Sequence, residues 1–231
     1  MKLAAIYNVF DGEELLAGSV SSVAKDVDVF IFIVSTVGQS GEEYWGGWEA
    51  VAKIECPNRQ IIISNDRELK KRNIGIQEAK RLGCTHFILM DCDEYWYGLD
   101  RTQIDCAHRL YTYFKDPTYQ LNPPEEYFVP GICTLKPDTK VGAFNCGFYC
   151  DPTRKPNHRL KEGESWMHHY SYIRANIDRK IRNSSASFNI EAKRKELETD
   201  LKSAESGYFS EFWQKTIILV PNYFNISLSN N

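Results

Sequence analysis

The sequence predicts an α/β protein with a mostly parallel central sheet flanked by helices, followed by a mixed C-terminal half. Apolar runs alternate with helical patterns through the first hundred residues, which is the pattern of parallel strands joined by helical crossovers. The run VDVFIFIV at residues 27–34 is almost continuously apolar, as expected for a strand covered on both faces. Polar residues follow the end of every predicted strand in this half.

Four strands are predicted in the first half. They are LAAIYNV, VDVFIFIV, QIIIS and HFILM, at residues 3–9, 27–34, 60–64 and 86–90. A helix is predicted after the first strand, because Asp11 and Glu14 have the spacing of a capping box. Another follows the third strand, with Asn65 and Asp66 as N-cap candidates and Gly83 just past its end.

The second half is less regular. Ile104, Ala107, Tyr111 and Phe114 have helical spacing and predict a helix before the turn-rich segment DPTYQLNPPEE. Strand-like pieces, a polar loop and a charged helix are predicted after it, at residues 126–135, 141–150, 151–163 and 191–206. The absence of repeats and linkers favours one domain over residues 1–231.

Composition excludes several classes of protein. The formal net charge is only -3, so nothing marks the molecule as a nucleic-acid binder. Seven cysteines occur without a C-x-x-C pair, which favours free thiols in a reducing compartment. No signal peptide is evident, and no apolar run approaches the roughly 20 residues of a membrane span. A cytoplasmic protein without a transmembrane segment is expected.

The predicted strand ends indicate a site. Asn8, Ser35, residues 64–66 and residues 91–94 each follow or end an apolar strand. Parallel α/β sheets bind ligands outside the carboxyl ends of their strands. We therefore expect these polar side chains to lie at one edge of the sheet.

The last of these segments lies within HFILMDCDEYW, in which an apolar strand is followed directly by a cluster of carboxylates. Alternation along the strand places Asp91 and Asp93 on one side, with Cys92 facing away. Two adjacent carboxylates repel each other unless a cation neutralises them. Mn²⁺ or Mg²⁺ held by carboxylates and substrate phosphates suits this D-x-D pattern. A solvated acidic turn is the alternative.

The surrounding sequence resembles family 2-type glycosyltransferases of the GT-A (Rossmann-like) fold over about residues 3–95. The resemblance rests on YNVFDGEELLAGSVSSV and on KKRNIGIQEAKRLGCTHFILMDCDE, in which Arg72, Gly75 and Gly83 precede the strand that ends in D-x-D. It implies a GT-A fold, a nucleotide-sugar donor, and a divalent metal held by Asp91 and Asp93.

One feature departs from that family. The usual Asp-Asp-x-Ser turn after the second strand is replaced by VSTVGQSGEE. Recognition of the base is therefore assigned to Ser35, Asp66 and Arg72, and the identity of the base stays open. Together with Asn8 and Asp91, these residues form the predicted donor-binding set.

A later segment, SWMHHYSYIRANIDRKI, is similar to the W-x-x-H-Y-S-Y stretch of family 17-type glycosyltransferases. The resemblance implies that His169 completes the metal site; a histidine packed against Trp166 and the nearby tyrosines is the alternative. Adjacent residues of a strand face opposite ways, so His168 is expected to pack instead. Arg174 and Lys180 are candidates to neutralise the donor diphosphate, although a solvated helix face would explain them equally well.

An inverting transfer needs a carboxylate that takes the proton of the acceptor hydroxyl. Asp151 is the favoured candidate, because it follows the predicted strand FNCGFYC; a loop-capping aspartate is the alternative. Glu94 is the second candidate, because it adjoins the metal-binding pair. Glu162 and Glu164 lie near the histidines on the same predicted loop.

The sequence thus predicts a metal-dependent glycosyltransferase that moves a sugar, from a UDP-sugar by preference, to an acceptor hydroxyl on a glycan. Residues 1–98 would form the nucleotide-sugar half, and residues 99–231 the acceptor-side half with C-terminal helices. A non-catalytic nucleotide- or sugar-binding module of the same fold is one alternative. A nucleotidyltransferase is another, although NVFDGEE is acidic where such enzymes have a Gly-rich, basic loop. A phosphohydrolase would carry D-x-D on its first strand instead.

Overall fold

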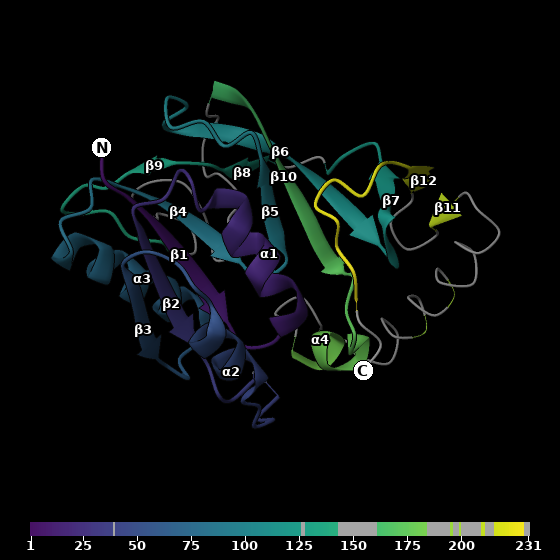
Figure 1. The fold of residues 1–231 in the computed structure, drawn as a ribbon, viewed down its shortest axis with the longest axis horizontal. Helices are drawn as coiled ribbons and strands as arrows, with labels where there is room; N and C mark the ends of the chain where they lie inside the picture. The colour runs from purple at the N-terminus through teal and green to yellow at the C-terminus, as the bar shows by residue number, and fades with distance from the viewer. Residues whose placement is uncertain are drawn as a thin grey trace.

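The computed structural model describes residues 1–38, 40–125, 128–142, 161–183, 195, 199, 209–210 and 215–228. Within these ranges the strands form two sheets, and α-helices cover both faces of the first (Figure 1). The α/β class predicted from the sequence is confirmed. The chain nevertheless forms two sheets rather than a single central one.

The first sheet contains four parallel strands. These are β1 (Leu3–Val9), β2 (Val29–Val34), β3 (Arg59–Ile63) and β4 (His86–Asp91), in the order β3-β2-β1-β4. A short antiparallel strand, β9 (Cys133–Thr134), extends the sheet beyond β4. All four predicted strands of the first half are confirmed, with end points that differ by up to two residues.

Three helices lie on the two faces of this sheet. The helices α1 (Glu13–Val23) and α2 (Gly46–Lys53) pack on one face, and α3 (Glu68–Arg81) packs on the other. Gly75 brings α3 close to the sheet, since a Cβ at this position would lie 2.2 Å from Cγ2 of Ile6. A side chain at Gly75 would therefore prevent this close packing of α3 on the sheet.

Both predicted N-caps are wrong, while the predicted C-terminal glycine is confirmed. The N-cap of α1 is Gly12, without a side-chain cap, and the Glu14 carboxylate instead accepts the N–H of Ala175. The N-cap of α3 is Arg67, because Asn65 accepts the N–H of Thr36 through its side chain. Long-range partners thus take Glu14 and Asn65, while Asp66 pairs with its neighbours Ser64 and Lys70. Gly83 follows α3 with a φ of 69°.

The second sheet contains both parallel and antiparallel strands. All of them come from the second half of the chain except β5, which is the first in sequence. Its order is β11-β12-β7-β6-β10-β5, with β8 also paired to β6. The strands are β5 (Glu94–Tyr97), β6 (Cys106–Phe114), β7 (Asp116–Asn122), β8 (Phe128–Pro130), β10 (Lys161–Tyr172), β11 (Phe209–Ser210) and β12 (Lys215–Leu219).

The predicted helix over residues 104–114 is wrong, because most of this segment forms β6. Its side chains alternate in direction: Leu110 enters the core shared by both sheets, while Tyr113 enters an aromatic cluster on the other face. The predicted turn-rich segment 116–126 is likewise mostly the strand β7. The strand-like segment 126–135 is confirmed in part by β8 and β9.

Several sequence predictions fall on residues that the structure does not describe. The predicted strand 141–150 is described only at its first two residues, and the charged helix over 191–206 only at residues 195 and 199. The loop predicted over 151–163 lies outside the described residues up to residue 160. Its last three residues belong to β10, which begins at Lys161. A short helix, α4 (Ile177–Asn183), follows β10.

One apolar core joins the two sheets. Tyr7 and Met90 from the first sheet share it with Trp96, Leu110 and Met167 from the second. No helix in the described ranges is long and apolar enough to cross a membrane.

Candidate functional site

The carboxyl ends of the parallel strands meet beside the second sheet. Asn8 on β1 is in register with Asp91 at the end of β4. Both polar atoms of the Asn8 amide are shielded from solvent and have no hydrogen-bond partner in the structure. Buried amide groups are nearly always hydrogen-bonded in folded proteins. Asn8 is therefore a marked exception at the edge where the sequence predicted a donor site.

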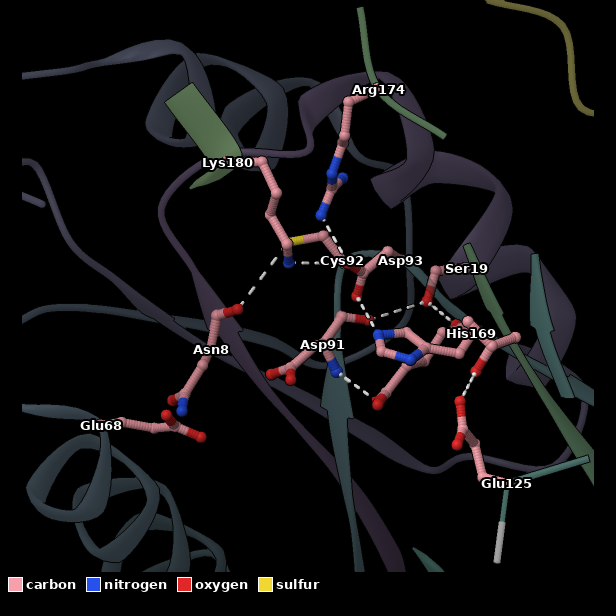
Figure 2. A network of polar contacts seen from close by, with 12 residues as sticks. Asn8, Ser19, Glu68, Asp91, Cys92, Asp93, Glu125, His169, Arg174 and Lys180 are labelled. Atoms are coloured by element: carbon pink, nitrogen blue, oxygen red, sulfur yellow. Dashed lines mark hydrogen bonds and ion pairs between the residues drawn. The ribbon is translucent and has the colours of Figure 1, made fainter. Parts of the chain in front are cut away.

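Asp91 forms an ion pair with Arg72. The Arg72 side chain is 1% exposed, and its Nη2 lies 3.3 Å from Oδ1 of Asp91 and 2.6 Å from Oε1 of Glu68. The Asp91 side chain is one-third exposed, and in Figure 2 its carboxylate points to the side on which Asn8 and Glu68 lie. Arg72 was predicted to contact the nucleotide. The structure places it where it orients Asp91.

Asp93 is buried and surrounded by the chain's own cations (Figure 2). Its Oδ2 accepts hydrogen bonds from Nη2 of Arg174 at 2.6 Å and Nζ of Lys180 at 3.1 Å. Nε2 of His169 lies 3.7 Å from its Oδ1. Burial alone would raise the pKa of Asp93, but Lys180, Arg174 and His169 outweigh it and hold that pKa well below its usual range.

The three predicted metal ligands do not form one ligand set. No group of three or more His, Cys, Asp or Glu side chains is placed to hold a metal among the residues described. His169 faces Asp93, whereas the Asp91 carboxylate points elsewhere (Figure 2). Mg²⁺ can be held by one carboxylate together with substrate phosphates and waters. Asp91, with its accessible carboxylate, fits that role, and Asp93 does not.

Glu94 fixes the turn between β4 and β5. It is 1% exposed, and its Oε2 accepts the N–H of Asp91 at 2.7 Å. Its backbone carbonyl accepts the hydroxyl of Ser19 from α1. A buried carboxylate with this partner stabilises the D-x-D turn, which differs from the proton-accepting role predicted for Glu94.

The predicted base-recognition residues lie near the carboxyl ends of β2 and β3. Ser35 donates to the carbonyl of Ser64 at 2.9 Å and accepts Nζ of Lys71 at 2.8 Å. Asp66 pairs with Lys70 at 2.8 Å instead. Burial lowers the pKa of Lys71, although the nearby carboxylates Glu68 and Asp91 oppose that shift.

The helix α4 lies against the loop that follows β2. The Glu42 carboxylate accepts hydrogen bonds from Arg179, Arg182 and Asn183, at 3.3, 3.3 and 3.2 Å. The Arg179 guanidinium also lies 3.6 Å from the centre of the Tyr44 ring. Because Lys180 belongs to the same helix, this docking determines how Lys180 reaches Asp93.

The two adjacent histidines of β10 face opposite ways, as predicted. His168 is 2% exposed, and its Nδ1 lies 2.6 Å from the hydroxyl of Tyr113. Burial lowers its pKa to about 4. The prediction that His168 packs in the interior is confirmed.

Sequence reasoning missed several residues of this edge. Lys71 adjoins the recognised Arg72, so its position beside Asp91 had a signal in the sequence. Glu42 had none, because its partners in α4 are distant along the chain. Glu125, which accepts the Thr112 hydroxyl, belongs to no motif. Asp151, the favoured catalytic carboxylate, lies outside the described residues.

No protein-family model matches the chain, and no curated protein matches its sequence. TarS 1-349 from S. aureus is 14% identical with a TM-score of 0.40, over 85% of this chain and 69% of that chain. The same protein in complex with UDP is 18% identical with a TM-score of 0.31, over 50% of this chain and 36% of that chain. Another TarS structure is matched over only 22% of its length.

Mannose-1-phosphate geranyltransferase from Thermus thermophilus is 12% identical with a TM-score of 0.32, over 88% of this chain and 65% of that chain. Similarities this low do not decide an activity.

Proposed function

We propose that the protein transfers a sugar from a nucleotide-sugar, a UDP-sugar by preference, to an acceptor hydroxyl on a glycan. One observation carries the proposal: the unpartnered, shielded amide of Asn8 lies in register with the accessible carboxylate of Asp91. A ligand with hydrogen-bonding groups at this edge would satisfy that amide. The edge is also where open parallel sheets bind nucleotides.

The charges around this edge suit a diphosphate leaving group. Lys71 donates to Ser35 and is near enough to Asp91 for that carboxylate to act on its pKa. Lys180 donates a hydrogen bond to Asp93 and has 23% of its side chain exposed. Cations placed where negative charge develops stabilise the transition state. Asp91 would hold Mn²⁺ or Mg²⁺ together with the donor phosphates, and the ion would supply further neutralisation of the leaving diphosphate. Arg72 and Glu94 keep Asp91 in place.

Binding of the donor is testable by thermal unfolding. UDP or a UDP-sugar should raise the melting temperature more in Mn²⁺ than in EDTA, by linkage to the folded state. Asn8→Ala should weaken nucleotide binding about 2- to 10-fold, the scale of one lost neutral hydrogen bond. Asp91→Asn should remove the dependence on Mn²⁺. Asp138→Asn, on an exposed aspartate, is the matched control.

Product analysis then separates the candidate functions. Release of UDP with transfer of the sugar supports the proposal. Pyrophosphate formed from a nucleoside triphosphate and a sugar phosphate would indicate nucleotidyl transfer instead. Binding without turnover on any acceptor would indicate a non-catalytic module. No response to any nucleotide would overturn both transferase functions and a nucleotide-binding module.

A further inference from the structure

A row of polar side chains crosses the second sheet beside the D-x-D turn. Glu94 on β5 is in register with His169 on β10, which is in register with Thr112 on β6. Directly paired residues in neighbouring strands point to the same face of a sheet. The row therefore lies on one face, and Oε1 of Glu125 continues it by accepting the Thr112 hydroxyl at 2.8 Å (Figure 2).

The next row along the same strands is apolar. Trp96, Met167 and Leu110 are in register with one another and enter the core between the sheets. The polar row thus forms the rim of that core, on the side where β4 ends. Glu125 is partly exposed at this rim, whereas Glu94 and Asp93 are each only 1% exposed.

The other carboxylates of this edge already have structural roles. Asp93 has a pKa far below its usual range, because Lys180 and Arg174 overcome the effect of its burial. Glu94 is buried and accepts the N–H of Asp91. Glu68 is paired with Arg72 at 2.6 Å. A general base must keep appreciable affinity for a proton and must be reachable by the group that it deprotonates.

We propose that Glu125 is the general base of the transfer reaction and that Thr112 positions it. This inference rests on the proposed function. As the acceptor oxygen bonds to the anomeric carbon, the bond from that carbon to the diphosphate breaks, and the diphosphate leaves with the electron pair. The proton of the acceptor hydroxyl passes to the Glu125 carboxylate. The reaction is a single displacement, so the anomeric configuration is inverted.

The spacing of the row agrees with this role. Neighbouring strands lie about 4.8 Å apart, so the row places Thr112 roughly 10 Å from Glu94 across β10. Glu125 accepts the Thr112 hydroxyl and therefore lies at the end of the row opposite the D-x-D turn, with β10 between them.

The test uses the full chain and an accepted nucleotide-sugar. Glu125→Gln should lower turnover about 100- to 10,000-fold, the usual contribution of general base catalysis, while the donor Kd changes less than twofold. Thr112→Val should lower turnover less and should displace the limb of the pH profile that reports the base. Glu55→Gln, on an exposed glutamate after α2, is the matched control. Circular dichroism of each variant verifies the fold.

The two proposals fail in different ways. If Glu125→Gln retains both turnover and the ascending limb of the pH profile, Glu125 is not the base, although the transferase itself stands. A product with retained anomeric configuration would also overturn the role of Glu125. If the wild-type protein neither binds nor consumes any nucleotide-sugar, the proposed function itself is wrong. If Glu125→Gln is unfolded, Glu125→Asp replaces it, and its expected result is a loss of turnover with unchanged donor affinity.

Discussion

Asp93 illustrates how one residue type can serve two opposed purposes. In an open metal site, the two carboxylates repel each other when the ion is absent. Asp93→Asn would remove one of these charges and so stabilise the metal-free protein. Here Asp93 is 1% exposed and paired with Arg174 and Lys180. Asp93→Asn should therefore destabilise the metal-free protein by roughly 3–5 kcal/mol, the cost of breaking a buried ion pair. Urea unfolding in EDTA measures the sign.

The acid dependence of stability provides a check on this variant. The folded-state pKa of Asp93 lies below its unfolded value, so its contribution is present above about pH 4 and is lost as the pH falls further. Asp93→Asn should remove that part of the acid dependence, and Asp138→Asn should leave it unchanged. A metal-free Asp93→Asn protein that is more stable than wild type would contradict the structural role.

His168 predicts a second effect, in a different pH window. Burial lowers its folded pKa to about 4, whereas a histidine in the unfolded chain has a pKa of about 6.5. The unfolded state therefore binds the proton more readily, and stability is lost as the pH falls from about 6.5 to 4. His168→Phe should flatten this window by roughly 1–3 kcal/mol. At pH 7.5 the difference in unfolding free energy between His168→Phe and wild type measures the packing change alone. If the variant loses stability between pH 6.5 and 4 as steeply as wild type, His168 is not the group responsible.

Among the elements, α4 is held both by Ile181, which packs in an apolar cluster with Phe114 and Leu121, and by polar contacts. Burial alone would raise the pKa of Glu42, but hydrogen bonds from Asn183, Arg182 and Arg179 hold it below its usual range. Glu42→Gln should speed amide hydrogen exchange in α4 and leave β1 and β4 unchanged, because ion pairs near the surface weaken when one charge is lost. Glu43→Gln, on an exposed neighbour, should alter neither. Equal exchange in both variants would mean that other contacts hold α4.

The strands of the first sheet were predictable because their apolar runs are bounded by turns and have no rival helical periodicity. Residues 104–114 were misread, since Ile104, Ala107, Tyr111 and Phe114 suit a helical stripe while the residues between them also alternate as a strand. Only pairing with β10 and β7 favours the strand. Both N-caps failed for a similar reason, because distant partners took Glu14 and Asn65.

The candidate site shows the same division. The position of Asp91 and Asn8 follows from strand order and was predicted. The partners of Asp93 were named as site residues, but their direct pairing with it could not be derived, because Arg174 is 81 positions away in the sequence. Glu125 carries no local motif. Its place beside Thr112 depends on the segment after β7, where the Glu125 N–H donates to the carbonyl of Leu110 on β6.

At the scale of the whole molecule, the shared core predicts that both sheets unfold together. Met167 is fully buried between them with Trp96 and Leu110. Met167→Ala should lower the free energy of unfolding by about 2–5 kcal/mol and shift one cooperative transition, observed equally by tryptophan fluorescence and circular dichroism. Two separated transitions would show that residues 1–98 and 99–231 are independent domains. A folded 1–98 fragment would show the same.

The long sequence separation between Asp93 and its cations also orders events in time. The parallel strands β1, β2 and β4 lie within the first 91 residues, so all three are synthesised well before Arg174. Arg174 and Lys180 follow Asp93 by 81 and 87 positions. A ribosome that adds about 5–20 residues per second needs roughly 4–16 s to cover the first of these gaps. During synthesis the acidic turn is therefore exposed before its counter-charges exist, and this edge of the first sheet is completed last.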